Sequence, residues 1–260
     1  MEFKFIIYEK TEAIATIVLN RPEALNAFSK EVVNEVLMAL EDAKADEAIR
    51  VVILMGNGEK AFSAGADIKA MKGMDSSGAR QLSLMGERLC SALENFEKPI
   101  IAAINGLALG GGLEVAMSCD FRIASETARV GQTEINIGLI PGWGGTQRLT
   151  RLVGPTKAKE LVLTGRIIDA KTAEQLRIVN QVVPADKFRE SVKQFAADLA
   201  TKAPIALRIA KELITKGAET SLDVALSLER EGFSVVGGTQ DLQEGVAAFT
   251  EKRKPVFKGR

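Results

Sequence analysis

The chain has no histidine, and its 260 residues include only two cysteines, one tryptophan and one tyrosine. Without histidine it cannot carry a Ser-His-Asp triad, a Cys-His pair or an HExxH zinc site. Any acid or base that works near neutral pH must therefore be a carboxylate, a lysine, a tyrosine or a cysteine. The search for chemistry narrows to carboxylates in unusual surroundings.

The chain also has no net charge, because 34 lysines and arginines balance 34 aspartates and glutamates. This balance gives no electrostatic footprint for a polyanion, so no nucleic-acid partner is expected. No apolar run is long enough to span a membrane, and the N-terminal residues Met1-Glu-Phe-Lys-Phe5 do not fit a signal peptide. Cys90 and Cys119 lack paired spacing. We expect reduced thiols, a cytoplasmic location and no membrane association.

Apolar residues are plentiful, at 46% of the chain, which is enough for a large core without disulfides or metals. Helical spacing follows Ser29, a plausible N-cap, and recurs over residues 80–96. From about Thr146 onward helical signals dominate. The pattern predicts an α/β fold, a spiral of strand-strand-helix repeats with a helical C-terminal region. Four segments have the apolar pattern of strands: 13–19, 51–55, 100–104 and 121–124.

The segment Gly56-Asn-Gly-Glu-Lys-Ala61 matches the loose GxGxxA pattern of dinucleotide-binding loops. That fingerprint requires a helix to begin at the glycines, so that its amides meet the pyrophosphate. The following Phe62-Ser-Ala-Gly-Ala66 is not a helix start. A tight turn is therefore predicted, with a loop over residues 61–68.

Three consecutive glycines, Gly110 to Gly112, precede a predicted helix that carries Glu114 among apolar neighbours. Glycine costs about 1 kcal/mol relative to alanine inside a helix, so this run needs a reason. Either backbones pack closely there, or the amides of a helix N-terminus meet an anionic atom. Glu134 lies in a similar setting beside Gly131. One such glutamate would be a solvated or ion-paired residue, whereas two of them make a plausible acid/base pair.

Seven segments, spread over essentially the whole chain, carry motifs that occur together in one family. In chain order they are 19–27, 62–69, 98–106, 108–120, 131–134, 141–149 and 249–254. The most specific is Ala108-Leu-Gly-Gly-Gly-Leu-Glu-Val-Ala-Met-Ser-Cys-Asp120. As an ordered set they resemble the enoyl-CoA hydratase/isomerase (crotonase) superfamily, and within it the bacterial-type enoyl-CoA hydratases.

The resemblance implies that the backbone amides of Ala66 and Gly111 form an oxyanion hole. It implies Glu114 and Glu134 as the two catalytic carboxylates, with Glu134 delivering the α-proton and Glu114 orienting water. No metal and no cofactor are implied, since CoA arrives as part of the substrate. The positions expected to contact substrate and CoA are Ala24, Leu25, Ala64, Gly65, Ala66, Asp67, Ile68 and Gly111.

The presence of both glutamates favours hydration of a 2-enoyl-CoA, as in fatty-acid β-oxidation, within this superfamily. Two alternatives remain, because the chain could be an enoyl-CoA isomerase, which commonly works with one carboxylate, or a non-catalytic RNA-binding member of the fold. The resemblance also implies a homotrimer, or a hexamer made of two trimers. Residues 1–200 would form the crotonase spiral core, and residues 201–260 a helical trimerisation region.

The chain departs from the family pattern at several positions. Glu23 stands where many relatives have lysine, so Lys69, Lys252 and Lys254 become the candidates for contact with CoA phosphates, with a solvated surface lysine as the alternative for each of them. Trp143 occupies a variable position of a glycine-rich turn and is expected to border the acyl pocket. The length of the acyl chain and the pathway are not encoded in any motif of this sequence.

Overall fold

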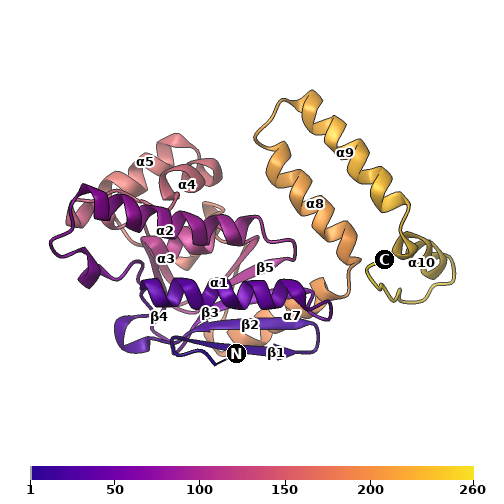
Figure 1. The fold of residues 1–260 in the computed structure, drawn as a ribbon, viewed down its shortest axis with the longest axis horizontal. Coiled ribbons are helices and arrows are strands. Elements are labelled where there is room, and N and C mark those ends of the chain that lie inside the picture. Colours follow the sequence, from indigo (N-terminus) through magenta and orange to yellow (C-terminus); the bar gives the residue numbers. More distant parts are fainter. Residues whose placement is uncertain (1) are drawn as a thin grey trace.

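The computed structural model describes residues 2–260 as a mixed α/β structure (Figure 1). Met1, which begins the segment considered as a signal peptide, lies outside the described residues. The helices are α1 (Lys30–Ala45), α2 (Ser76–Glu94), α3 (Gly111–Met117), α4 (Gly145–Val153), α5 (Pro155–Thr164), α6 (Ala170–Gln175), α7 (Phe188–Ala200), α8 (Pro204–Gly217), α9 (Leu222–Gly237) and α10 (Gln240–Thr250). As the sequence indicates, Ser29 caps α1, since its hydroxyl accepts a hydrogen bond from the Val32 amide.

A six-stranded sheet forms the base of the structure, with strand order β1-β2-β3-β5-β7-β10. The pair β1 and β2 is antiparallel, and every other neighbouring pair is parallel. The strands are β1 (Ile6–Thr11), β2 (Ile14–Leu19), β3 (Val51–Gly56), β5 (Ile100–Ile104), β7 (Phe121–Ser125) and β10 (Gln181–Val183).

The central strand β3 is buried along its whole length because both faces of this sheet are covered. Side chains of a strand alternate between the two faces. Val52 and Leu54 belong to the larger apolar core, which also takes in the buried face of α1, whereas Val51 and Ile53 pack in a second core with α7. Double coverage explains why this strand reads as a continuous apolar run.

A second sheet of four short strands has the order β4-β6-β8-β9. Its strands are β4 (Ala61–Ser63), β6 (Leu107–Leu109), β8 (Arg129–Gly131) and β9 (Ile168–Asp169). The first three run parallel, and β9 pairs antiparallel with β8.

The two sheets are connected by three strand-strand-helix repeats: β3-β4-α2, β5-β6-α3 and β7-β8-α4. In each repeat the first strand joins the six-stranded sheet and the second joins the four-stranded sheet. The predicted spiral is therefore confirmed. Since β4, β6 and β8 are parallel neighbours, the segments that follow them emerge at the same edge of the small sheet.

Several short strands were not predicted from the sequence. β4 lies within the segment expected to be a loop, and β9 and β10 lie in the region where only helices were expected. None exceeds three residues, so none is long enough to show an alternating pattern. They exist because a distant parallel or antiparallel neighbour supplies their hydrogen bonds.

The glycine-rich segment after β3 is a tight turn, as predicted, and no helix begins there. An added Cβ on Gly56 would lie 2.2 Å from the Ala61 carbonyl oxygen, and Gly58 has a positive φ of 79°. Close backbone approach accounts for Gly56, and the left-handed conformation accounts for Gly58. Cys90 and Cys119 are both buried and form no disulfide. Among residues 2–260, no helix is both long and apolar enough to cross a bilayer.

The helices α8, α9 and α10 extend beyond the rest of the molecule, and α8 and α9 form an antiparallel pair (Figure 1). An ion pair ties this arm to the core, because the Lys211 ammonium lies 2.8 Å from the Asp120 carboxylate. Burial raises the pKa of Asp120, and the Lys211 charge opposes that shift. The same carboxylate accepts a hydrogen bond from the Ile100 amide at the start of β5.

Replacing Lys211 with Met should destabilise the protein, since it leaves the Asp120 carboxylate without its cation. Breaking a fully buried pair costs about 3–5 kcal/mol, and this pair is partly exposed, so we expect a loss of about 2 kcal/mol in the free energy of unfolding. Urea titration at fixed protein concentration measures it. The double variant Asp120→Asn/Lys211→Met should recover part of the loss; additive losses would contradict this pairing.

Candidate active site

Three loops meet at the edge where β4, β6 and β8 end. They are residues 64–67 after β4, Gly110 and Gly111 after β6, and residues 132–134 after β8. An added Cβ on Gly111 would lie 3.3 Å from the Ala66 nitrogen, and one on Gly65 would lie 3.1 Å from the Gly111 nitrogen. The first two loops are therefore in direct backbone contact.

The amides of Ala66 and Gly111 have no hydrogen-bond acceptor within residues 2–260. The groups on either side of the Ala66 amide are hydrogen-bonded to Phe28. The Phe28 amide donates to the Gly65 carbonyl, and the Asp67 amide donates to the Phe28 carbonyl. Gly111 is the first residue of α3, where helix geometry leaves amides unpaired. Two unpaired donors on adjacent loops are able to stabilise negative charge on one oxygen.

Glycine is required beside these amides because the helix begins against a strand. An added Cβ on Gly112 would lie 2.2 Å from the Ser63 carbonyl oxygen at the end of β4. Gly110 has a φ of 50°, and its added Cβ would approach the Glu134 carboxylate to 3.0 Å. Close backbone packing therefore accounts for the triple glycine, and the free amide of Gly111 is compatible with contact to an anionic atom as well.

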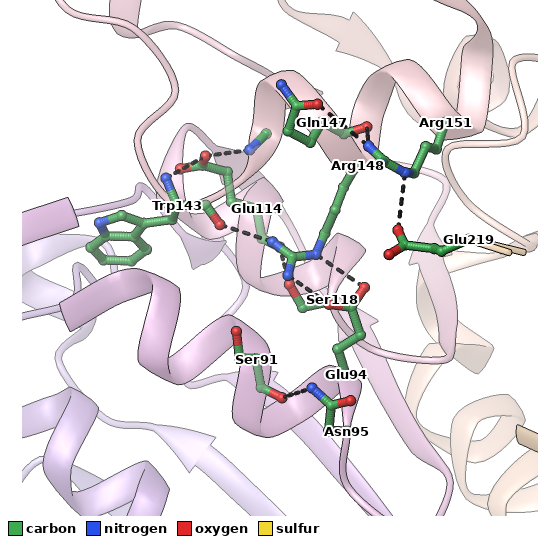
Figure 2. A network of polar contacts seen from close by, with 11 residues as sticks. Ser91, Glu94, Asn95, Glu114, Ser118, Trp143, Gln147, Arg148, Arg151 and Glu219 are labelled. Atoms are coloured by element: carbon green, nitrogen blue, oxygen red, sulfur yellow. Dashed lines mark hydrogen bonds and ion pairs between the residues drawn. The ribbon is translucent and has the colours of Figure 1, made fainter. Parts of the chain in front are cut away.

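The carboxylate of Glu114 is buried on α3 and is held by the glycine-rich turn at residues 141–145 (Figure 2). Its Oε1 accepts hydrogen bonds from the Trp143 amide at 2.8 Å and the Gly145 amide at 2.6 Å. Its Oε2 accepts none within residues 2–260. Burial raises the pKa of Glu114, while the two amides favour its charged form and oppose the shift.

Arg148 fixes the turn that holds Glu114. Its guanidinium donates to the Trp143 carbonyl at 3.0 Å and forms a two-point contact with Glu94 on α2 (Figure 2). A side chain on Gly144, whose φ is 104°, would collide with the same guanidinium. The turn is therefore anchored to α2 by a bidentate ion pair of the stronger kind.

Glu134 begins the short helical turn Glu134–Ile137 and lies next to Gly110. Burial, with a smaller contribution from the Glu114 charge, raises the pKa of Glu134 to about 7. Gln132 is buried beside it, and with its amide nitrogen facing the carboxylate it donates to both oxygens at 3.1 Å. The predicted pair of carboxylates is therefore brought together, with Glu134 near its midpoint of titration at neutral pH.

A fourth loop, residues 20–27 near the start of the chain, packs beside the segment 64–67. The Ala64 amide donates to the Leu25 carbonyl, and Arg21 forms an ion pair with Asp67 at 3.0 Å. Leu25 adopts a left-handed conformation with a φ of 50°. These two adjoining loops thus contain five of the positions expected to contact the substrate: Ala24, Leu25, Ala64, Gly65 and Asp67. Ile68 follows them, with 65% of its surface exposed.

Sequence reasoning missed two functional elements of this site. Gln132 was not singled out, although its position two residues before Glu134 was a usable signal. The amides of Trp143 and Gly145 were also missed, because a backbone donor leaves no mark on residue identity.

Lys69, Lys252 and Lys254 are exposed and lie in no ion pair within residues 2–260. No cluster of three or more potential metal ligands occurs in this part of the chain.

The fold and the site define the crotonase class of α/β proteins. Residues 9–260 match the family model described as enoyl-CoA hydratase/isomerase. The chain is 43% identical to a crotonyl-CoA hydratase from Syntrophomonas wolfei, over 99% of each chain. It is also 43% identical to a short-chain-enoyl-CoA hydratase from Clostridium acetobutylicum, over 98% of this chain and 97% of the relative.

Solved structures agree with these relatives. An enoyl-CoA hydratase from Bacillus anthracis superposes with a TM-score of 0.96 at 42% identity, covering 99% of this chain and 100% of the other. The chain belongs to the enoyl-CoA hydratase/isomerase family, as its sequence motifs predicted.

The raised pKa of Glu134 makes a prediction about stability. Between pH 4.5 and about 7 the folded protein binds a proton that the unfolded chain has released, so this residue makes the fold less stable as pH rises through that window. Glu134→Gln should remove this penalty and be more stable than the wild type at pH 8, by about 1–3 kcal/mol.

The difference should shrink to near zero at pH 4.5, and urea titrations at both pH values at fixed protein concentration test it. Glu87→Gln, an exposed glutamate on α2, is the matched control and should show no such difference. Equal stability of Glu134→Gln and wild type at pH 8 would contradict the raised pKa.

Proposed function

We propose that this protein is an enoyl-CoA hydratase that adds water reversibly to a trans-2-enoyl-CoA, giving a 3-hydroxyacyl-CoA. The observation that carries the proposal is the meeting of two free amides, the buried Glu114 and the half-buried Glu134 at one edge of the small sheet. Hydration requires both features, one for the developing negative charge and one for the protons. The names of full-length relatives at 43% identity support the same activity.

In this mechanism the thioester oxygen accepts hydrogen bonds from the Ala66 and Gly111 amides. Attack of water on Cβ pushes the double-bond electrons toward Cα and that oxygen, and the two donors stabilise the resulting enolate. Loss of one such donor typically costs about 3–4 kcal/mol. Because both donors are backbone groups next to glycines, the carbonyl can approach without meeting a side chain.

The two glutamates divide the proton transfers. Glu114 has one oxygen held by two amides, so its Oε2 is available to orient the water and take up its proton. Glu134, with a pKa of about 7, is present partly as the acid at neutral pH and delivers a proton to Cα. One proton is taken and one is given, so atoms and charge balance in the step; Glu114 ends protonated and Glu134 ends as the carboxylate, and proton exchange with solvent restores the starting enzyme. Gln132 positions Glu134 through its two hydrogen bonds.

Glu114→Gln and Glu134→Gln should each lower kcat for crotonyl-CoA by about 10²–10⁴-fold, with little change in KM. Loss of the conjugated thioester absorbance measures the rate, and Glu87→Gln serves as the control. Near-normal turnover in either variant would show that its proposed role is wrong. A wild type that isomerises a 3-enoyl-CoA but does not hydrate crotonyl-CoA would favour the isomerase alternative.

We further propose that the site takes short acyl chains, because Trp143 fills the space beside the oxyanion donors. Its indole packs on Gly86 of α2 and Gly111 of α3, where an added Cβ would lie 2.0 and 2.9 Å from ring atoms. Its Nε1 donates to the Leu82 carbonyl, and its ring meets that of Phe28 edge-on at 5.8 Å. Two glycines thus admit a bulky ring at the place where a longer acyl chain would need room.

Trp143→Ala should raise kcat/KM for decenoyl-CoA relative to crotonyl-CoA by roughly tenfold, as expected when a hydrophobic pocket gains room for several methylenes. For Trp143→Phe, the ratio of the two kcat/KM values should lie between those of the wild type and Trp143→Ala. A ratio unchanged in both variants would mean that the ring does not limit chain length.

The remaining requirements follow from the same proposal. CoA enters only as part of the substrate, and contacts with it would come from the loops at residues 24–25 and 64–68. We place the protein in the cytoplasm, with neither a further cofactor nor a metal. The glutamate pair argues against the RNA-binding alternative, as does the zero net charge.

We also propose a homotrimer or a hexamer, with residues 1–200 as the spiral core and residues 201–260 as the trimerisation region. The arm exposes large apolar side chains, among them Ile214 at 73%, Leu222 at 72% and Phe233 at 80%. Contiguous apolar surface of this kind marks an interaction site. We propose that a second copy of the chain covers it.

Size-exclusion chromatography with light scattering should give three or six times the 27.9 kDa protomer mass. Phe233→Asp should shift the mass toward the protomer, because it places a charge in the apolar contact. Arg189→Asp, at an exposed position on α7 outside residues 201–260, is the control and should keep the assembly. A protomer mass for the wild type would contradict the proposal.

A further inference from the structure

A second concave surface lies between the core and the C-terminal arm. This cleft, of about 730 Å³, is bounded by the C-terminal end of α1, the segment before β5, the start of α8 and the last residues of the chain. In Figure 1 these parts lie together near the C terminus. Its volume is in the range of pockets that bind cofactor-sized molecules.

The cleft stands apart from the proposed active site. Arg50 lies one residue before β3 and Lys98 lies two residues before β5, so they mark the amino ends of these parallel strands. The active-site loops leave the carboxyl ends of β4, β6 and β8. None of the residues that line the cleft belongs to those loops.

Positive charge is concentrated in this cleft although the whole chain is neutral. Seven lysine and arginine side chains line it, against two side-chain carboxylates, those of Glu47 and Glu97. Arg50 and Lys98 are engaged with backbone carbonyls: Arg50 donates to Phe257 O at 2.7 Å, and Lys98 donates to carbonyls at the end of α1. Within residues 2–260, the other five make no side-chain hydrogen bond or ion pair: Lys44, Lys202, Arg208, Lys258 and Arg260.

All five of these cations are exposed, and like charges gathered along one concave surface raise its positive potential and attract an anion. The start of α8 adds to this potential. Pro204 occupies its first position, no side chain caps it, and Arg208 follows in the next turn. The amino end of a 14-residue helix carries partial positive charge.

The walls are not wholly polar. Ile49, Ile205 and Leu207 line the cleft together with the cations. Arginine forks and lysine ammonium groups both bind phosphate oxygens well. A ligand with several phosphate charges would balance the excess of cations, and the apolar wall could contact an organic part.

We propose that this cleft is a binding site for a small polyphosphate anion, distinct from the acyl-CoA site. The ligand class is a chain of two or more phosphates, either inorganic or esterified to an organic group. Binding neutralises the side chains of Lys44, Lys202, Arg208 and Lys258, and it joins the arm to the core through one shared anion.

Isothermal titration of the full-length protein with inorganic tripolyphosphate, and separately with ATP, tests the proposal. Saturable binding should appear and weaken as NaCl is raised. Tighter binding of ATP would assign the apolar wall to an organic group, and equal affinity would assign the site to the phosphate chain alone. No saturable binding of either ligand would overturn the proposal.

The variant Lys202→Glu/Arg208→Glu should bind roughly tenfold more weakly or not at all, since it removes two charge-assisted contacts. The matched control is Lys171→Glu/Lys187→Glu, which makes the same change in net charge at exposed positions away from the cleft and should bind like the wild type. Equal loss in both variants would mean that binding follows net charge, and would overturn the site.

Two further readouts distinguish the cleft from the thioester site and from a contact between protomers. The cleft variant should keep the wild-type KM for crotonyl-CoA; a raised KM would mean that the cleft belongs to the thioester site. It should also keep the wild-type mass in light scattering. A changed mass would mean that an acidic segment of a neighbouring copy occupies the cleft, and the proposal would be wrong.

Discussion

The parallel pairing of the short strands β4, β6 and β8 is the constraint on which the site depends. Each is only three residues long, yet their register places Ser63 beside Ala108 and Leu109 beside Gly131. Because the three strands point the same way, the residues that follow them converge at one edge. The free amides of Ala66 and Gly111 come from the first two strands, and Glu134 comes from the third. If the pairing of these strands slipped by one residue, it would turn the donors and the carboxylate away from one another.

A second layer of structure keeps the carboxylates in place. Glu114 sits on the short helix α3 and is held by two amides of the turn at 141–145, which Arg148 anchors to Glu94. Glu134 meets Gln132 and lies against Gly110. The two environments differ, since two amides favour the charged form of Glu114, whereas burial and its neighbour's charge raise the pKa of Glu134. Different surroundings of this kind allow two identical side chains to take different proton-transfer roles.

Much of this was visible in the sequence. The long apolar strand β3, the helix capped by Ser29 and the spiral of repeats were predicted and are confirmed, as is the family. The absence of histidine directed attention to Glu114 and Glu134, and the structure places them near each other. Strands β4, β6, β8, β9 and β10 escaped prediction because their hydrogen-bond partners are distant in the chain, and β1, which pairs with β2, was not predicted either. The amides of Trp143 and Gly145 escaped because backbone donors have no side-chain signature. The packing of Trp143 on Gly86 depends on a contact between elements more than fifty residues apart.

The proposed mechanism depends on two preorganised amides that polarise the thioester carbonyl. It is tested most directly by the infrared carbonyl stretch of bound butanoyl-CoA, a saturated thioester that cannot be hydrated, with an isotope label at the carbonyl carbon. We expect a shift to lower wavenumber on binding, because two hydrogen bonds weaken the C=O bond. A carbonyl band at the same wavenumber in the complex and in water would contradict it, since the amides of Ala66 and Gly111 would then offer no more than the solvent does.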